Sequence, residues 1–355
     1  MKIIHPRPNP IVAAMYTLRD MNVDVIVVHG PAGCSFMASR SLEEAGVRVV
    51  TSGINDSDLV FGAAEPLIET LKLVKEKFDP KTVAVIGTCA SMIIGEDMEA
   101  AIRRADIGCT VFSVDCHGCM RNNTSGAILA IQSAEKAGII PHEEAERQCA
   151  MMNAATDLEK RTGMAGKDYL LPTRGPTKVG VAKKVIDVLR NGGKVTAAII
   201  AKKELIYRFV DLFLALDEAK RKVGGETRFI ANIDPNIGLP RIRGYANDVL
   251  SELDSKGVKV DDIVGGLDEY AVIGDRIKAA ADASGYDMLI VVGIAHAYPE
   301  LPKDAVLITD QPRQLANYLN SGYANSLGEI SSHSMVMSAK RIVPLETADT
   351  IRELL

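Results

Sequence analysis

The sequence predicts an α/β protein built from two Rossmann-like domains, each with a parallel sheet, and three observations support this prediction. Short runs rich in valine and isoleucine alternate with helical patterns along most of the chain. The alternation occurs twice, on either side of a segment in which glycine and proline are concentrated. The chain has 355 residues, which is too long for one ordinary domain and leaves enough apolar residues for a core in each of two.

The first domain is expected to span residues 1–165. Its strands are predicted near residues 23–28, 47–51, 83–87 and 111–115, and its helices near residues 10–20, 35–45, 63–77 and 96–105. A longer helical stretch follows from about residue 124 to 160, with an interruption at Gly138-Ile-Ile-Pro141. Because strands and helices alternate, we expect a parallel sheet that is covered by helices on both faces.

The second domain is expected to span residues 166–355, beyond the breakers in Thr162-Gly-Met-Ala-Gly-Lys-Asp168 and Pro172-Thr-Arg-Gly-Pro176. Its strands are predicted at 195–201, 227–233, 288–293 and 306–309, and its helices near 203–222, 241–256 and 267–282. Asn191-Gly-Gly-Lys194 is expected to stop a helix before the first of these strands. Residues 346–355 are predicted to form a closing helix after a polar segment at 331–337.

Composition and charge exclude several classes of protein. The net charge of −5 and the isoelectric point near 5.8 give no basic surface for nucleic acid. No apolar run approaches membrane-spanning length and the start of the chain lacks a signal-peptide pattern, so we expect a cytoplasmic protein. Neither a Gly-x-x-x-x-Gly-Lys-Ser/Thr loop nor a Gly-x-Gly-x-x-Gly loop after a strand is present. If the reaction uses ATP, another chain binds it.

Two of the six cysteines each follow a predicted strand. Val23-Asp-Val-Ile-Val-Val28 leads into His29-Gly-Pro-Ala-Gly-Cys34, and Val83-Ala-Val-Ile86 leads into Gly87-Thr-Cys89. Ligands of open α/β proteins bind beyond the carboxyl ends of the strands, so both thiols are candidate iron ligands. Either cysteine alone would be explained equally well as a small buried residue at a turn. Iron–sulfur clusters usually need four thiolates, so the missing half points to a partner or to a second copy of the chain.

A further pair, Cys116 and Cys119, follows the predicted strand at 111–115 and opens onto the same edge of the sheet. The Cys-x-x-Cys spacing is compatible with zinc, with a redox dithiol or with a cluster. Our preferred interpretation is that this pair lines the substrate cavity. Cys109 and Cys149 are expected to have structural roles only.

Four histidines are candidates for a functional role. His29 and His117 lie next to the proposed cluster and can donate protons near neutral pH. His296 ends a strand of the second domain and is expected to face the cleft between the domains, and His333 lies in the polar segment near the end of the chain. Each of them also has an ordinary structural interpretation.

Taken together, the sequence blocks resemble the catalytic component of nitrogenase and of the dark-operative protochlorophyllide and chlorophyllide reductases. The resemblance covers roughly residues 25–120. It rests on His29-Gly-Pro-Ala-Gly-Cys34, on Asp58-Leu-Val-Phe-Gly62, on Gly87-Thr-Cys89 with Ile94-Gly-Glu-Asp97, and on Asp115-Cys-His-Gly118. The compact length, the His5-Pro-Arg-Pro-Asn-Pro10 start and Asp115-Cys-His-Gly-Cys119 are most similar to the nitrogenase-like subunit family of the archaeal Ni-sirohydrochlorin a,c-diamide reductive cyclases.

The resemblance implies a nitrogenase component 1 type fold and a two-component oxidoreductase. A separate ATP-hydrolysing iron protein is expected to deliver electrons, and a 4Fe-4S cluster on this chain to relay them to a nickel tetrapyrrole. The substrate, Ni-sirohydrochlorin a,c-diamide, would be reduced and closed into a lactam in the biosynthesis of the nickel coenzyme of methyl-coenzyme M reductase. Related chains commonly carry a further cysteine upstream of Cys34, and this chain has none around residues 5–10. The resemblance therefore implies that Cys34 and Cys89 of two copies hold one cluster across a homodimer interface.

The expected site residues fall into three groups. The metal ligands are Cys34 and Cys89. The candidate proton donors are His29, Asp115 and His117. The residues expected to contact the tetrapyrrole are Arg7, Cys116, Cys119, Arg121, Asn122, His296 and His333, among which Arg7, Arg121 and Asn122 would bind peripheral carboxylates.

Two alternatives stay open at this point. Gly87-Thr-Cys-Ala-Ser91 also resembles the small subunit of nickel–iron hydrogenases, an electron-transfer module, although few further cysteines are present for several clusters. The other alternative is a scaffold without enzymatic activity that carries a cluster or a tetrapyrrole and passes it to a partner.

Overall fold

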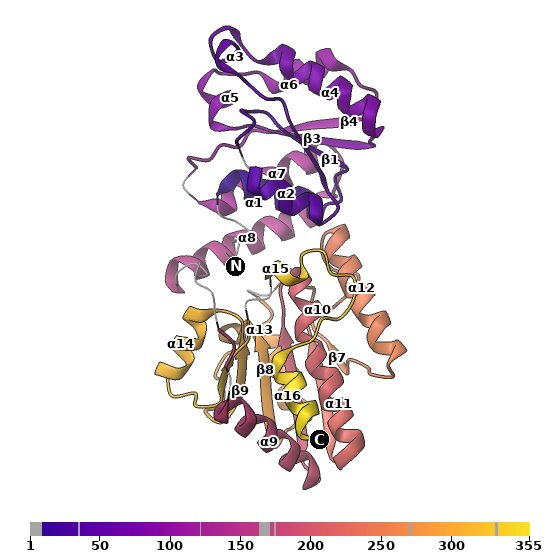
Figure 1. The fold of residues 1–355 in the computed structure, drawn as a ribbon, viewed down its shortest axis with the longest axis vertical. Helices are drawn as coiled ribbons and strands as arrows, with labels where there is room; N and C mark the ends of the chain where they lie inside the picture. The colour runs from indigo at the N-terminus through magenta and orange to yellow at the C-terminus, as the bar shows by residue number, and fades with distance from the viewer. Residues whose placement is uncertain are drawn as a thin grey trace. The chain divides into compact units, whose positions relative to one another are not determined.

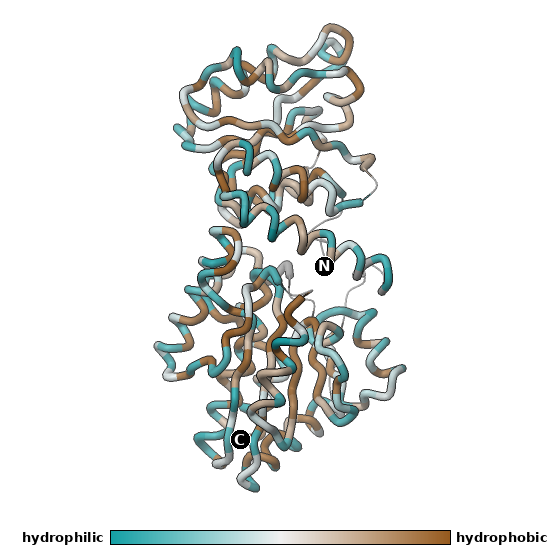
Figure 2. Tube along the Cα trace, turned by 180° about the vertical axis from the view of Figure 1, so that it is seen from behind, coloured by the Kyte–Doolittle hydropathy of each residue, from teal (hydrophilic) through white to brown (hydrophobic). Residues whose placement is uncertain are grey.

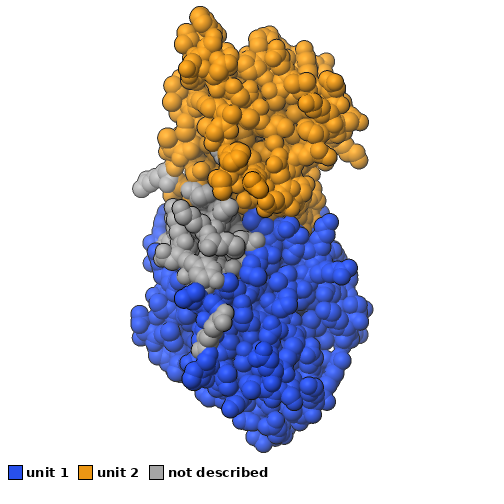
Figure 3. All heavy atoms as spheres, in the orientation of Figure 1, with its two compact units in different colours: residues 1–4, 158–238, 242–355 blue, residues 5–157, 239–241 orange. Residues whose placement is uncertain are grey.

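The computed structural model describes residues 9–34, 36–120, 122–162, 171–173, 175–269, 272–330 and 333–355. It divides the chain into two compact units, coloured orange and blue in Figure 3. The N-terminal unit comprises residues 5–157 with 239–241, and the C-terminal unit comprises residues 1–4, 158–238 and 242–355. The predicted domain boundary at 165/166 lies outside the described residues and stays a prediction.

The sheet of the N-terminal unit has four parallel strands in the order β2-β1-β3-β4. Their bounds are β1 Val25–Val28, β2 Arg48–Thr51, β3 Thr82–Ile86 and β4 Thr110–Val114. All four were expected, and the central strand β1 is buried along its whole length because both of its faces are covered. The parallel α/β sheet predicted for this part of the chain is confirmed.

The helices of this unit lie on both faces of the sheet. Figure 1 shows α4 and α6 on one side and α1 and α7 on the other. On the first side, Val25 and Val27 of β1 pack with apolar residues of α4 and α6. The helices are α1 Pro10–Asp20, α2 Phe36–Glu44, α3 Asp56–Phe61, α4 Ala64–Phe78, α5 Cys89–Ile93, α6 Met98–Ala105, α7 Asn123–Lys136 and α8 His142–Thr162. The short helices α3 and α5 were not predicted.

The sheet of the C-terminal unit has six parallel strands in the order β10-β9-β8-β5-β6-β7. Their bounds are β5 Lys194–Ile200, β6 Glu226–Ala231, β7 Asp262–Ile263, β8 Met288–Gly293, β9 Val306–Thr309 and β10 Ser326–Gly328. The four longer strands were predicted. The edge strands β7 and β10 were not, because runs of two and three residues leave no alternation to detect.

The helices expected at 241–256 and 346–355 form, whereas those at Pro176–Arg190, Pro312–Asn320 and His333–Val336 had no predicted range and two others differ from the prediction. The single helix expected at 203–222 is divided into three pieces, and the helix expected from 267 begins only at Gly274, after a turn at Gly265 whose φ is +76°. The elements are α9 Pro176–Arg190, η1 Lys203–Leu205, α10 Ile206–Phe209, α11 Asp211–Val223, α12 Pro240–Ser255, α13 Gly274–Ser284, η2 Ala295–Ala297, α14 Pro312–Asn320, α15 His333–Val336 and α16 Glu346–Leu354. The predicted stop after α9 and the closing helix α16 are confirmed.

Apolar residues gather along the strands of each unit, as the brown segments of Figure 2 show. Each sheet therefore lies in its own hydrophobic core, as its parallel pairing requires. Within the part of the chain that the structure describes, no helix has both the length and the apolar character needed to cross a membrane.

Candidate functional site

The carboxyl ends of three neighbouring strands form the edge of the N-terminal sheet at which the predicted residues gather. The parallel pairing continues one residue beyond the strands. The His29 amide donates to the Ile86 carbonyl at 2.8 Å, and the Gly87 amide donates to the Val114 carbonyl at 3.0 Å. The loops that follow β1, β3 and β4 are therefore held side by side, and we call this edge the rim.

The first rim loop, residues 29–34, is held by Thr88 of the second. The Thr88 hydroxyl donates to the His29 carbonyl at 2.9 Å. A Cβ atom on Gly30 would lie 2.6 Å from the Thr88 side chain, so only glycine fits at this position. The Cys34 amide donates to the Pro31 carbonyl at 2.9 Å and closes the turn. The loop thus presents a half-buried Cys34 at the rim.

The second rim loop places Cys89 at the first residue of α5. Thr88 caps this helix, and its amide donates to the Ser91 hydroxyl at 2.8 Å. The Cys89 thiol is half-buried and accepts a hydrogen bond from the Gly118 amide at 3.2 Å. Its sulfur lies 3.7 Å from the sulfur of Cys119. The second and third rim loops therefore meet at the Cys89 sulfur.

Cys34, Cys89, Cys116 and Cys119 come together at the rim, and we call them the rim thiols. Burial raises the pKa of Cys34, and the neighbouring Cys89 raises it further. Burial raises the pKa of Cys116 to about 12, with additional contributions from Asp115 and Cys89. A hydrogen bond to Cys89 raises the pKa of Cys119. Without a cation these three side chains stay neutral, whereas a bound metal ion deprotonates its thiol ligands and removes their mutual repulsion.

His117 joins two of the rim thiols in a compact group. A ring nitrogen of His117 and the sulfurs of Cys89 and Cys119 all lie within 4.8 Å of one another. The buried Nδ1 of His117 has no hydrogen-bond partner among the described residues. Asp115, at the start of the same loop, is exposed. The residue types and positions at the rim therefore fit an iron–sulfur cluster, as well as other thiophilic metal ions.

His29 is fully buried beneath the rim. Its Nδ1 is 2.9 Å from the Ser52 hydroxyl, and its buried Nε2 has no partner among the described residues. Burial lowers the pKa of His29 to about 4, and the charge of Asp58 opposes this shift only in part. At neutral pH the side chain is therefore an uncharged imidazole, which can donate a hydrogen bond but has no acidic proton to release. The role of His29 as a proton donor is not supported by this environment and stays a prediction.

The other expected site residues are not brought to the rim by any contact in the described part of the chain. Arg7 and Arg121 lie outside the described residues. His333 begins α15, and its side chain also lies outside them. Asn122 precedes α7 and makes no side-chain cap there. His296 belongs to the C-terminal unit, where burial lowers its pKa. Their roles toward the tetrapyrrole stay predictions.

The two cysteines that were expected to be structural lie apart from the rim thiols. Cys109 directly precedes β4, at the amino end of the sheet, where it faces the charges of Lys75 and Asp79. Cys149 lies within α8 near Glu135. Cys109 is thus at the end of β4 opposite to the rim, and both cysteines serve as control positions for the rim thiols.

Large apolar side chains are exposed on the three short helices next to the rim, a feature that was not predicted from the sequence. Phe61 is 87% exposed, Ile93 76% and Val60 74%. We call the whole set the rim hydrophobics: Phe36, Met37, Leu59, Val60, Phe61, Met92 and Ile93. The signal available in the sequence was three consecutive apolar residues, Leu59-Val-Phe61, within the α3 segment, which follows polar residues and has no strand to pack on.

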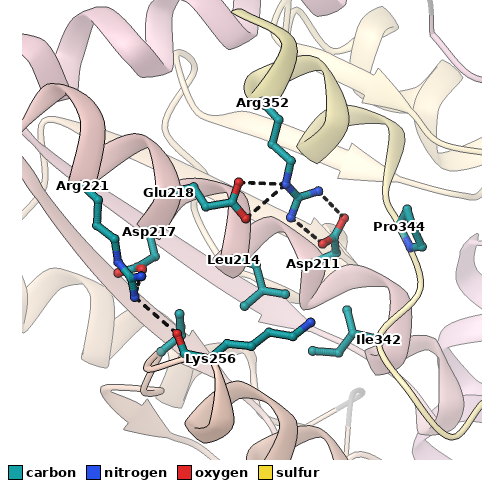
Figure 4. Close-up of a pocket in the computed structure, with 10 residues that line it drawn as sticks. Asp211, Leu214, Asp217, Glu218, Arg221, Lys256, Ile342, Pro344 and Arg352 are labelled. Carbon is teal, nitrogen blue, oxygen red and sulfur yellow. Dashed lines mark hydrogen bonds and ion pairs between the residues drawn. The ribbon is translucent and has the colours of Figure 1, made fainter. Parts of the chain in front are cut away.

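Two pockets accompany these features. A hollow of about 400 Å³ lies next to Cys34, between α2 and the ends of β1 and β2, and is lined in part by Val28, Phe36 and Thr51. A pocket of about 560 Å³ in the C-terminal unit contains none of the expected site residues. Figure 4 shows that its Arg352 is paired with Asp211 and Glu218. Its charged groups are therefore used within the fold, and the rim is the better candidate site.

Comparison with known proteins gives matches over the whole chain. Residues 10–164 match the family described as Nitrogenase component 1 type Oxidoreductase. The Ni-sirohydrochlorin a,c-diamide reductive cyclase complex component CfbD of Methanosarcina acetivorans is 42% identical, over 99% of this chain and 97% of its own. The component of the same name from Methanothermobacter thermautotrophicus is 42% identical over 98% of both chains. The nitrogenase molybdenum-iron protein alpha chain of Clostridium pasteurianum is 32% identical over 29% of this chain and 21% of its own.

Proposed function

Because the chain belongs to the family of component CfbD of the Ni-sirohydrochlorin a,c-diamide reductive cyclase complex, we propose that it is the substrate-binding catalytic component of such a reductase. It is a nitrogenase-like oxidoreductase in the biosynthesis of a nickel tetrapyrrole in methanogens. The reaction reduces the macrocycle of Ni-sirohydrochlorin a,c-diamide and closes an amide side chain into a lactam. The hydrogenase-like and scaffold alternatives are not favoured by this family membership.

The observation that carries the proposal is the convergence of thiols at the rim. Cys34 and Cys89 follow the neighbouring strands β1 and β3, whose last residues Val28 and Ile86 pair in register, so both loops leave the same edge of the sheet. We assign them as iron ligands, and a 4Fe-4S cluster bound there would relay single electrons from an ATP-hydrolysing iron protein to the tetrapyrrole. The Gly118 amide would stabilise the Cys89 thiolate through its hydrogen bond to sulfur.

A homodimer supplies the remaining ligands in this proposal. Two thiolates per chain make four in a pair of chains, which is the number that a 4Fe-4S cluster needs. The rim hydrophobics support the pairing, since large exposed apolar side chains next to an incomplete site mark a surface that another chain covers. A second copy would bury these side chains and exclude water from the cluster at the same time.

The third rim loop supplies the candidate groups for substrate binding and proton delivery. His117 is half-buried next to Cys89 and has a free buried Nδ1 among the described residues, so its ring can hold and release a proton at the rim. The exposed Asp115 is placed to return a proton from solvent. Arg7, Arg121 and Asn122 are assigned to the peripheral carboxylates of the macrocycle, with Cys119, His296 and His333 as further contacts. Cys116, which was expected to make such a contact, is buried and is not assigned one.

The direct test is turnover under anaerobic conditions. Purified protein is mixed with its iron protein, ATP, a low-potential reductant and Ni-sirohydrochlorin a,c-diamide, and the product is followed by absorbance and mass spectrometry. We expect a reduced, lactam-containing product from the wild type and from Cys109→Ala, and none from Cys34→Ala or Cys89→Ala. A wild-type protein with a full iron complement that leaves the macrocycle unreduced would overturn the proposal.

A further inference from the structure

The Cys-x-x-Cys pair of the third rim loop does not act as a pair. Cys116 is only 1% exposed, and its sulfur contacts the Met120 sulfur at 3.8 Å. Cys119 is exposed, and its sulfur contacts Cys89 of the neighbouring loop at 3.7 Å. The loop thus buries the Cys116 thiol and places the Cys119 thiol against Cys89, which is 30 residues earlier in the chain.

The spacing of Cys89 and Cys119 matches two ligands of a single ion. Two thiolates bound to one tetrahedral ion, each at about 2.3 Å, are separated by roughly 3.8 Å. The observed sulfur–sulfur distance is 3.7 Å. Thiolates bound to different irons of a 4Fe-4S cluster lie farther apart. In the metal-free chain this contact is a hydrogen bond between the two thiols, and the same spacing suits two thiolates on one ion.

His117 supplies a third ligand atom to the same point. Its ring nitrogen and the two sulfurs lie within 4.8 Å of one another, so a closure of roughly 1 Å brings the nitrogen to tetrahedral spacing. The Gly118 amide, between His117 and Cys119, already donates to the Cys89 sulfur, as backbone amides do around metal-bound thiolates. Two sulfurs and an imidazole select soft or borderline divalent ions.

We propose that Cys89, His117 and Cys119 form a three-ligand site for one divalent ion, Fe²⁺ or Zn²⁺, with the fourth tetrahedral position open. Binding displaces the protons of the two thiols and involves no electron transfer. The inference rests on the proposed function in one respect: Cys89 is also a ligand of the proposed cluster. The single ion and the cluster therefore exclude each other at Cys89.

The first experiment is a Co²⁺ titration of the full chain after its iron has been removed anaerobically. We expect one Co²⁺ per chain, thiolate-to-cobalt charge-transfer bands, and displacement of the cobalt by Zn²⁺. Cys119→Ala and Cys89→Ala should weaken binding by more than the roughly 100-fold that loss of an outer-sphere partner costs. Cys116→Ala is the matched control from the same loop, and it and Cys34→Ala should bind as the wild type does. Unchanged binding in Cys119→Ala, or a requirement for Cys34, overturns the inference.

The second experiment uses cluster reconstitution and does not depend on the stability of the metal-free chain. Iron and sulfide are added with and without Zn²⁺, and cluster formation is followed by visible absorbance. Zn²⁺ should slow reconstitution of the wild type at least tenfold, and Cys119→Ala should lose most of this inhibition. Equal inhibition in both proteins rejects the single-ion site. Loss of the cluster in Cys34→Ala would still support the proposed function, so the two hypotheses fail separately.

Discussion

At the scale of single residues, the structure divides the expected site into groups that the sequence could and could not resolve. The positions of Cys34 and Cys89 were predictable, because a residue that follows a parallel strand lies at the carboxyl edge of the sheet. The division of Cys116 from Cys119 was not, since the spacing alone does not say which way each thiol of a turn points. The burial of His29 was also hidden, because a histidine next to a glycine turn is just as compatible with an exposed position.

The cluster ligands provide the first prediction. Cys34→Ala or Cys89→Ala should abolish the visible iron–sulfur absorbance, because each removes one of only two thiolates that a chain contributes. Cys109→Ala and Cys149→Ala, whose thiols lie away from the rim, should keep it. The measurement is absorbance and iron content of anaerobically purified protein. A full cluster in Cys34→Ala would contradict the assignment.

His117 should have a kinetic role in proton delivery. Loss of a positioned general acid typically costs ~100- to 10,000-fold in the step that it serves. His117→Ala is therefore expected to keep the cluster and the dimer but to slow product formation, measured with excess iron protein and ATP so that electron supply does not limit the rate. His117→Asn tests whether hydrogen bonding alone suffices. Turnover at the wild-type rate in His117→Ala would leave this residue with a structural role only.

His29 should make the stability of the fold depend on pH. Its pKa is about 4 in the folded protein, against 6.5 for an unperturbed histidine, so the unfolded chain binds the proton more tightly between these values. The free energy of unfolding is expected to fall as the pH falls from about 6.5 to 4, by on the order of 3 kcal/mol. Burial also lowers the pKa of His296, which therefore contributes to the pH dependence in the same direction. The contribution of His29 is obtained by denaturant unfolding of the wild type and of His29→Gln across this pH range, as the difference between their free energies of unfolding. Parallel pH profiles for the two proteins would count against it.

At the scale of elements, the helices and strands that were predicted correctly are mainly the longer and more deeply buried ones. Buried strands of four or more residues and the long amphipathic helices gave clear periodic signals, and all of them formed. The misses were α3, α5, α9, α14, α15, β7 and β10, most of which are short. Of α9, only the stop after it was predicted. Two of these misses, α3 and α5, carry most of the rim hydrophobics, so the error concealed a surface that bears on function.

The packing of α1 against α7 depends on one glycine. A Cβ atom on Gly126 would lie 1.9 Å from the Pro10 carbonyl oxygen, which belongs to the backbone of α1 and cannot move aside cheaply. Gly126→Ala should therefore destabilise the protein by about 1–3 kcal/mol, as overpacking does. Gly180→Ala in α9 is the matched control: nothing lies within 4 Å of its added Cβ, so it should be neutral or stabilising by up to about 1 kcal/mol. Thermal unfolding of both variants decides, and equal melting temperatures would refute the close contact.

At the scale of the whole molecule, the sequence predicted two parallel-sheet units but not the surface through which two chains would meet. Composition gives the number of apolar residues but not which of them the fold leaves exposed, so the seven rim hydrophobics could be identified only in the structure. They lie next to the two cysteines that we propose as half of the ligand set of a shared cluster, so the proposed assembly and the proposed chemistry involve the same surface.

The dimer should therefore depend on these apolar side chains. Phe61→Asp with Ile93→Asp is expected to yield a monomer by light scattering and to lose the cluster, although every cysteine is intact. Leu73→Asp, on α4 and half exposed, is the control and should stay dimeric. Wild-type iron should approach about four atoms per dimer. About eight would instead indicate a separate cluster in each chain and remove the argument for a shared one.

The amide pairs that extend the sheet past β1, β3 and β4 have a consequence for electron transfer. They extend the backbone hydrogen bonding of the sheet into the loops of Cys34 and Cys89. The hydrogen bond from the Thr88 hydroxyl to the His29 carbonyl also joins the first loop to the second. Ligands fixed in this way change position little when the charge between them changes. A cluster bound to the rim as proposed would therefore have a low reorganisation energy, so that an electron could arrive and leave without the protein having to rearrange around it.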